Sequence, residues 1–496
     1  MTPTIRRDVV FGPALVLVTG RTVGFAVSFA IPVVLARLFD RAEFGTYKQL
    51  FLIYATLYGL AQVGIAESLY FFIPRQPDDA GRGVLNALVT LALAAIAAAG
   101  LLWWMRIAIA ARLTNTDLAR HLPLTAAFLA LTLLSAVFEI VTISRKQFLK
   151  AAAVYGGSDV AKTAFLIVPA AAMWGLHGVL AGAVVFALLR LLAMVIYLWR
   201  EFGRGLRLDL GLWRGQLAYA LPFGLAVGVD VVQANLHQYF VASRFNVETF
   251  AIYAVGCLQI PLVDLVCTST ANVMMVKMAE QRAEEDTRAT LALWHDTTCR
   301  LASIIFPLAA FLVVTARGII VLLFTKRYLA SVPIFTIWCL MIVPSVLSVD
   351  AMLRVYARTR FLLILNVSRL ALVAASISWF MSRFGLAGAV LVTLLTTCLV
   401  KMCGVVKIAR ILKVDLVEML PWRRLAVIAI EGAIAAMPAH LASRAFTGPA
   451  PAAVIVTGTM YILTYGVLRL LSTWWEGTGL LATLLPLPTP RIDTAD

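Results

Sequence analysis

The sequence has few charged residues, and this scarcity limits what the chain can be. Asp, Glu, Lys and Arg make up 14% of the 496 residues, whereas hydrophobic types make up 61%. The mean hydropathy is +0.91. Soluble domains contain about 45–50% apolar and about 25% charged residues. Water therefore cannot be the main solvent of this chain, and no soluble domain large enough to house an enzyme is expected.

The residues that build metal, disulfide and nucleotide sites are also scarce. The six cysteines all fall inside apolar runs without CxxC spacing, so neither a disulfide framework nor a zinc site is predicted. The five histidines are isolated from one another. No GxxxxGK[ST] motif is present, which excludes an ATP-binding cassette pump within this chain. We therefore predict no catalytic residues, no metal site and no cofactor.

Acidic residues are fewer than basic ones, and the formal net charge is +16. The basic residues are scattered singly between apolar runs and form no Lys/Arg block, so nucleic acid is not an expected partner. The imbalance is better explained as a signal of membrane topology.

Long apolar runs fill most of the chain. A bilayer core of about 30 Å needs about 20 apolar residues per helix, and charged or Gly/Pro-rich breaks divide the sequence into fourteen such runs. The first run follows Arg6 and Arg7 without a clean signal-peptidase site, which predicts a retained span. The fold class is thus all-α and polytopic. The predicted spans are 10–36, 45–73, 84–105, 122–143, 157–174, 178–199, 216–241, 248–275, 299–324, 333–353, 361–381, 386–409, 425–442 and 452–471.

The loops between these spans carry unequal positive charge. One alternating set holds most of the loop Lys and Arg, including Arg145, Lys146 and Lys150. By the positive-inside rule, this set and both termini are cytoplasmic, which requires an even number of spans. We expect a multi-pass protein of the cell inner membrane.

Two pairs of segments indicate an internal repeat. Residues 36–47 and 242–253 share Ala, Phe, Phe and Tyr at a shift of 206, with Asp40 opposite Asn246. Residues 175–178 (GLHG) match 385–388 (GLAG) at a shift of 210. Six helices per unit is an even number, so the two units insert with the same orientation, related by a pseudo-two-fold along the membrane normal.

The repeat divides the chain into predicted domains. We expect one six-helix lobe at 1–200, a second at 215–410, two additional helices at 424–471 and a disordered cytoplasmic tail at 485–496.

Several local features resemble a known family. They are the long first span beginning at Phe11-Gly12-Pro13, the segment from Leu35-Ala36-Arg37 to Phe44-Gly45-Thr46-Tyr47, and the stretch 64–67. With these, residues from about 10 to 410 resemble the polysaccharide exporter and O-antigen flippase family of the multidrug/oligosaccharidyl-lipid/polysaccharide exporter superfamily.

The resemblance implies two six-helix lobes around a central cavity. It also implies that the chain flips an undecaprenyl-diphosphate-linked oligosaccharide from the cytoplasmic to the periplasmic leaflet by alternating access. The product would serve the biosynthesis of a cell-surface polysaccharide, an exopolysaccharide or lipopolysaccharide. A saccharide polymerase and chain-length machinery would be possible partners, beside the lipid-linked substrate and membrane lipids.

Charged residues inside the predicted spans need partners or water. An acid at a helix centre costs about 2.5–3.5 kcal/mol on insertion scales, so each must be paired, hydrated or near an interface. Asp159 and Lys162 are three residues apart, and Asp350 and Arg354 four apart, so each couple is expected to pair on one helix face. Three further cations are expected to reach an interface: Arg190, Arg317 and Lys401.

Arg21 and Asp230 lie near the middle of their spans without an opposite charge one turn away. Under the repeat, Arg21 corresponds to position 227, close to Asp230 on the seventh helix. In the resembled fold both helices border the cavity, so Arg21 is a candidate for binding the diphosphate or, between substrates, Asp230. A purely structural salt bridge between the lobes is the alternative.

Further polar residues are expected along the same cavity. Asp230, Gln233 and His237 have the i, i+3, i+7 spacing of one helix face, which suits sugar hydroxyls or a proton relay. Arg369 and Lys48 would add positive potential, and arginine binds phosphate in bidentate fashion. Asp264 follows Pro261 on the eighth helix and, with Asp230, is a candidate for the coupling ion.

Other functions compete with this interpretation. A lipid II flippase would share the fourteen helices and the basic cavity, and a drug/cation antiporter of the same superfamily would need unpaired cavity acids. A membrane saccharide polymerase or glycosyltransferase usually needs a sizeable outer loop, whereas no predicted outer loop exceeds roughly 16 residues. An enzyme is therefore not expected.

Overall fold

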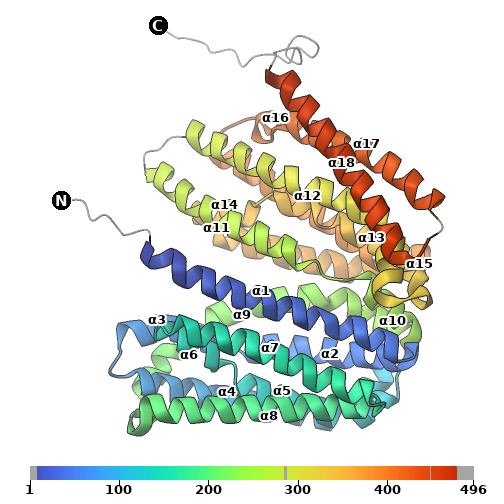
Figure 1. Cartoon of the computed structure of the whole chain (residues 1–496). Coiled ribbons are helices and arrows are strands. Elements are labelled where there is room, and N and C mark those ends of the chain that lie inside the picture. Colours follow the sequence, from blue (N-terminus) through green and yellow to red (C-terminus); the bar gives the residue numbers. More distant parts are fainter. Residues whose placement is uncertain (1–7, 284–286, 447, 478–496) are drawn as a thin grey trace. The chain divides into compact units, whose positions relative to one another are not determined.

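The chain is helical throughout the part that the structure describes. The computed structural model describes residues 8–283, 287–446 and 448–477, which contain helices and no β-strand (Figure 1). Side chains are described from Gly20 onward, except those of Arg21, 261–262, 281–283 and 473–477. The predicted tail at 485–496 lies outside these residues. The all-α prediction is confirmed.

The chain divides into two compact units. Unit 1 contains the described residues up to Val255 together with Asn366–Thr393, and unit 2 contains Gly256–Leu365 and the residues from Leu394 onward. The units do not coincide with the predicted lobes at 1–200 and 215–410, which stay a prediction.

The helices up to the end of unit 1's first segment are α1 Asp8–Leu38, α2 Arg41–Ala61, α3 Ile65–Arg75, α4 Ala80–Arg112, α5 Asp117–Leu134, α6 Val137–Ser144, α7 Phe148–Ala171, α8 Gly175–Phe202, η1 Gly203–Gly205, α9 Leu210–Arg244 and α10 Val247–Gly256. The remaining helices are α11 Pro261–Ala283, α12 Thr287–Phe324, η2 Lys326–Ser331, α13 Val332–Leu340, η3 Val343–Val346, α14 Val349–Val355, α15 Thr359–Leu412, α16 Leu416–Met419, α17 Trp422–Ala445 and α18 Ala450–Gly477.

Each predicted span falls on a helix or on a broken helix. Within the described residues, ten helical segments are long and apolar enough to cross a membrane, or eleven if the bent pair of α2 and α3 counts as one span. The chain is thus a multi-pass membrane protein. The difference from fourteen arises partly because α15 contains two predicted spans: its 54 residues would measure about 80 Å, far more than a bilayer core of about 30 Å.

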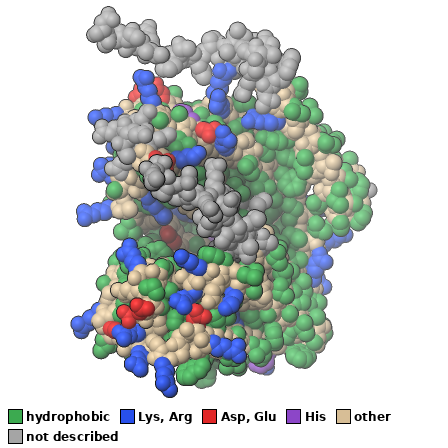
Figure 2. Space-filling model, turned by 60° about the vertical axis from the view of Figure 1, so that its left-hand side comes forward, with side chains coloured by type: hydrophobic (Ala, Val, Ile, Leu, Met, Phe, Trp, Pro, Cys, Tyr) green, Lys and Arg blue, Asp and Glu red, His purple; other side chains and the backbone are tan. Residues whose placement is uncertain are grey.

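Large apolar side chains on the surface fit a lipid environment. On α4, the exposed fractions are 70% for Ile96, 81% for Trp104 and 71% for Ile107. On the face in Figure 2, hydrophobic side chains cover most of the right-hand part, whereas Lys and Arg gather toward the left. Contiguous apolar surface of this kind marks membrane contact in a chain of this composition.

The internal repeat is visible in the backbone. Non-helical positions with φ between 49° and 75° recur at nearly constant spacing, and the matching residues are Thr114 with Thr325, Lys146 with Ala357 and Gly175 with Gly385. The shifts are 211, 211 and 210 residues. Positive φ is uncommon outside glycine, so its coincidence at three pairs of positions supports a duplicated chain path.

The other pair of repeated segments, residues 36–47 and 242–253, has matching helix caps. The Asp40 carboxylate accepts a hydrogen bond from the Glu43 amide at 2.7 Å. The Asn246 side-chain oxygen accepts one from the Thr249 amide at 2.9 Å. In both N-caps the side-chain oxygen accepts from the backbone amide three residues later. Asn in place of Asp therefore preserves the cap.

Asp209 starts α9, the helix that carries most of the candidate site. Its carboxylate accepts hydrogen bonds from the amides of Gly211 and Leu212, both at 3.0 Å, and lies 3.4 Å from Arg82. The backbone hydrogen bond from Leu212, with the bond from Gly211 and the charge of Arg82, holds the pKa of Asp209 below its usual value. The cap therefore favours the ionised form.

We expect Asp209→Ala to lower the midpoint temperature of thermal unfolding at neutral pH, because α9 loses its cap. Since the folded-state pKa is lowered, the contribution is present above the ordinary Asp value of about 4 and is lost as the pH falls through the lowered one. Thermal unfolding of both proteins in detergent at several pH values would test this. A gap that stayed constant down to acid pH would contradict the role of the ionised carboxylate.

Candidate functional site

A polar stripe runs along α9 within unit 1. Gln233 and His237 are buried, with 8% and 2% of their surface exposed, whereas Asp230 at the end of the stripe is exposed. The imidazole Nδ1 of His237 lies 2.6 Å from the hydroxyl of buried Tyr253 on α10. Burial of polar groups in a membrane helix is costly unless they are hydrogen-bonded or face water. The stripe is therefore a candidate site.

The first part of α15 brings further polar groups to this stripe. Asn366 donates a hydrogen bond to the carboxylate of Asp230 at 3.5 Å. Arg369, one turn further along α15, is close enough for its charge to act on His237. Unit 1 thus gathers four predicted binding residues, Asp230, Gln233, His237 and Arg369. Asn366 was missed because a single uncharged amide within an apolar run gives no signal in the sequence.

The other predicted site residues lie on other helices. Lys48 on α2 lies over the ring of Phe44, with its Nζ 5.6 Å from the ring centroid. Asp264 on α11 is exposed and belongs to unit 2. Arg21 lies in α1, but its side chain is outside the described residues. Helix α1 packs along α7. The two helices are close at Gly24, because a Cβ atom added there would lie only 2.6 Å from a carboxylate oxygen of Asp159 on α7.

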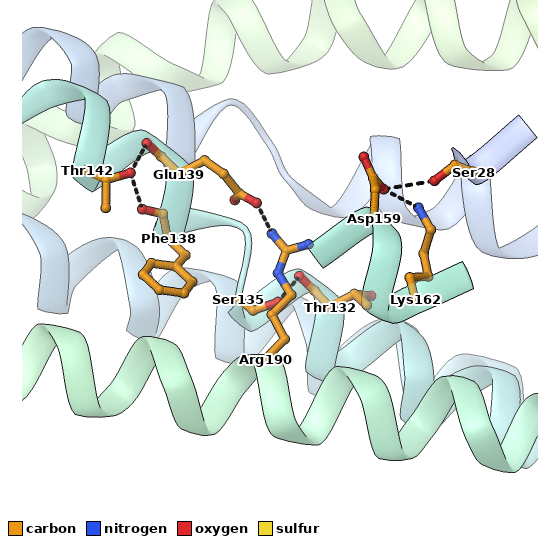
Figure 3. A network of polar contacts seen from close by, with 9 residues as sticks. All are labelled: Ser28, Thr132, Ser135, Phe138, Glu139, Thr142, Asp159, Lys162 and Arg190. Carbon is orange, nitrogen blue, oxygen red and sulfur yellow. Dashed lines mark hydrogen bonds and ion pairs between the residues drawn. The ribbon is translucent and has the colours of Figure 1, made fainter. Parts of the chain in front are cut away.

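A second polar network in unit 1 was not predicted as a site. Arg190 on α8 forms an ion pair with Glu139 on α6 at 2.5 Å, and their side chains are 20% and 8% exposed (Figure 3). The expectation that Arg190 reaches the membrane interface is therefore wrong. Its partner is 51 residues away in sequence, so no pattern along one helix could reveal it.

Asp159 on α7 forms the other half of this network. Its carboxylate lies 2.7 Å from the Lys162 ammonium and accepts a hydrogen bond from Ser28 on α1 at 3.0 Å. In Figure 3 the side chains of Ser28 and Lys162 approach Asp159 from the same side. The predicted pair of Asp159 and Lys162 is confirmed, because residues three apart share a helix face.

A cavity of about 440 Å³ opens beside these two ion pairs. Three carboxyl groups and one guanidinium line it, from Glu67, Glu139, Asp159 and Arg190. Its other polar lining residues are Tyr58, Gln62, Tyr70, Tyr155 and Ser158. The cavity lies entirely in unit 1 and can hold water or a small ligand.

Unit 2 has its own ion pair and cavity. Lys401 on α15 donates to Asp350 on α14 at 2.9 Å, so the prediction that Asp350 pairs with Arg354 is wrong, as is the expectation that Lys401 reaches the interface. Packing of α15 on α14 supplies a cation from another helix. A cavity of about 290 Å³ beside this pair is lined by Asp350, Arg354 and Lys401, among others.

The polar groups on and around α9 and the two ion-pair cavities can bind polar or charged ligands. The α9 stripe offers imidazole and amide groups, Tyr253 on α10 adds a hydroxyl and Arg369 on α15 adds a guanidinium, and groups of these kinds suit sugars and phosphate. In the part of the chain that the structure describes, no cluster of three or more His, Cys, Asp or Glu side chains could hold a metal ion.

The sequence matches one known protein family. Residues 34–333 match the family described as polysaccharide biosynthesis protein. No curated protein matches the chain in sequence.

Solved structures share the fold at low identity. The lipid II flippase MurJ, in an inward closed conformation, aligns with a TM-score of 0.70 and 14% identity over 94% of this chain and 99% of that chain. An inward-facing MATE-family multidrug resistance transporter of the MOP superfamily gives 0.62 and 12% over 79% and 94%. A MOP superfamily transporter from Pyrococcus furiosus gives 0.57 and 13% over 81% and 95%.

Proposed function

Because the chain belongs to the polysaccharide biosynthesis protein family and has the fold of these transporters, we propose that it is a flippase. The substrate is an oligosaccharide linked to a lipid diphosphate, moved from the cytoplasmic to the periplasmic leaflet by alternating access. The observation that carries the proposal is the family match over 34–333 on a fold that MurJ, a lipid II flippase, also adopts.

The α9 stripe supports the substrate class. Arg369 supplies a guanidinium that can bind a phosphate with two hydrogen bonds, and Gln233 and His237 offer groups for sugar hydroxyls. Arg21 and Lys48 extend the positive charge along the route, with Arg21 the residue proposed to bind the diphosphate. An anionic lipid headgroup would find complementary charge here.

Asp230 is the proposed coupling residue on this stripe. Its carboxylate is exposed and accepts a hydrogen bond from Asn366. Asp230 lies on the same helix as Gln233 and His237, so an ion bound to it would change the electrostatic potential at the substrate-binding groups. Asp264, exposed on α11, is the other proposed coupling acid. Neither needs a nucleotide, and an ion gradient or downhill substrate removal supplies the energy.

The structural likeness to MurJ favours one second candidate. A lipid II flippase shares the fold, so lipid II is the alternative substrate for the groups on α9 and α15. The sequence family favours a polysaccharide precursor instead. In either case the chain acts as a transporter and not as an enzyme, in the cell inner membrane with both termini cytoplasmic. Polymerase and chain-length proteins are proposed partners.

A deletion strain tests the proposed function. We expect intact carrier-linked glycan to accumulate in the cytoplasmic leaflet, where an impermeant glycosidase or lectin cannot reach it from the periplasmic side of oriented vesicles. Mass analysis of the accumulated lipid then identifies the glycan and separates a polysaccharide precursor from lipid II. Complementation with the intact chain is the control.

The other outcomes are informative in opposite directions. Accumulation of flipped but unpolymerised units would assign the chain to an enzymatic step after translocation. An unchanged glycan pool would contradict a flippase and would favour a drug/cation antiporter.

A further inference from the structure

The helices α7 and α8 of unit 1 run antiparallel and pack against each other (Figure 1). They are in close contact toward the end of α7, where a Cβ atom added at Gly182 would overlap the carbonyl oxygen of Phe165. At Gly157, two turns nearer the start of α7, an added Cβ atom would meet no other group within 4 Å. The seam between the two helices is therefore closed at one end and open toward the other.

The open part of this seam is a mostly apolar groove of about 200 Å³. Its α7 wall includes small residues spaced four apart, Ala153, Gly157 and Ala161. The lining residues farthest from the start of α7 and the end of α8 are Phe165 and Phe186. Arg190 also lines the groove, but its charge is already paired with Glu139. The groove therefore suits a hydrocarbon chain.

A second cavity, of about 470 Å³, lies where α7 begins and α8 ends. It adjoins the groove, because Ala193 lines both. Its lining residues are Lys150, Ala193, Ile196, Tyr197, Arg200 and Glu201. Charged and polar side chains thus lie at one end of the apolar groove, among the loop cations whose excess predicts the cytoplasmic side.

This second cavity has an excess of positive charge. Its acid, Glu201, lies 3.1 Å from Arg145 and accepts a hydrogen bond from the Gln147 amide at 3.3 Å. Lys150 and Arg200 are exposed, and neither forms an ion pair with a residue that the structure describes. The cavity therefore offers two cations to an anionic group.

The cavity and the groove together have the length of one leaflet. Phe165 lies 15 residues after Lys150, which corresponds to about 22 Å of helix. Half of a bilayer of about 40–45 Å, headgroups included, is about the same length. The path also opens to the bilayer, since Leu189 in the groove is 49% exposed and Ile196 beside the cations is 53% exposed.

We propose that this path binds one anionic glycerophospholipid of the cytoplasmic leaflet, with its phosphate between Lys150 and Arg200 and one acyl chain along Gly157. Basic pockets between membrane helices on the cytoplasmic side bind anionic headgroups. A zwitterionic lipid brings its own ammonium group to the same cations and therefore binds less well. The bound lipid fills the seam where α7 and α8 separate, which stabilises unit 1. The inference goes beyond the proposed function and does not depend on it, since binding needs neither glycan nor transport.

Native mass spectrometry and thermal unfolding measure the binding. The purified, delipidated chain in detergent is titrated with phosphatidylglycerol or with phosphatidylethanolamine of the same acyl chains. We expect one phosphatidylglycerol to bind saturably, about tenfold more tightly than phosphatidylethanolamine, which is the effect of about one charge-assisted hydrogen bond. The same lipid should raise the unfolding temperature. Equal binding of the two lipids, or binding without saturation, would overturn the proposal.

Two kinds of variant assign the binding to this path. Lys150→Gln with Arg200→Gln should lose the preference for phosphatidylglycerol. The matched control is Arg204→Gln with Arg207→Gln, which removes the same charge from exposed positions outside the cavity and should keep the preference. Gly157→Leu fills the groove without touching either cation, so it should weaken binding of both lipids.

Three results would contradict the assignment. They are unchanged phosphatidylglycerol binding by Gly157→Leu, equal losses in the two charge variants, and recovery of a lipid diphosphate instead of a phospholipid from the site in protein purified from native membranes. Failure of the leaflet assay would refute the flippase and leave the lipid-binding result unaffected.

Discussion

Arg190→Met is expected to destabilise the folded chain by about 3–5 kcal/mol, the range observed when one member of a buried ion pair is removed. Glu139 is 8% exposed and would remain in the membrane without its guanidinium partner. This loss is comparable with a large part of a typical net stability of about 5–15 kcal/mol. Unfolding in mixed detergent or denaturant, with and without the substitution, measures the effect.

The double variant Glu139→Gln with Arg190→Met is the matched control. With both charges gone, no carboxylate is left unpaired, so much of the lost stability should return. Lys401→Met in unit 2 is a second comparison and should cost less, because Asp350 is 51% exposed and can be hydrated. Equal losses for Arg190→Met and the double variant would show that packing, and not charge pairing, explains the effect.

Arg21→Ala is expected to abolish glycan export while the protein still inserts and accumulates, because the central cation proposed for the diphosphate is removed. Arg21→Lys keeps the charge without the two-pronged geometry and should give intermediate export. Surface polysaccharide in a complemented deletion strain, normalised to the amount of protein in the membrane, measures both.

Arg317→Ala offers a control of the same chemistry. Arg317 is an exposed cation of α12 and was expected to reach an interface, so its loss should leave export near normal. Normal export by a stably expressed Arg21→Ala protein would remove Arg21 from the mechanism. Arg369→Ala would then be the variant to compare, since Arg369 lies on α15 one turn after Asn366, which donates to Asp230.

The sequence by itself determined the fold class and the chain path. Runs of about 20 apolar residues must become helices in a bilayer, because only internal hydrogen bonding satisfies the backbone there. Local rules also sufficed for the Asp159 and Lys162 pair, three residues apart on one helix. The stripe of Asp230, Gln233 and His237 follows from helical periodicity alone.

Only the tertiary structure decided which charges meet between helices. Glu139 pairs with Arg190, and Asp350 pairs with Lys401 and not with Arg354. In both pairs the cation is 51 residues from the acid in sequence. The break before α6 likewise has no sequence marker, since Ser135 and Ala136 interrupt the span predicted at 122–143 without proline or glycine. A residue's neighbours on its own helix are fixed by the helical repeat, whereas its neighbours on other helices depend on how every span packs.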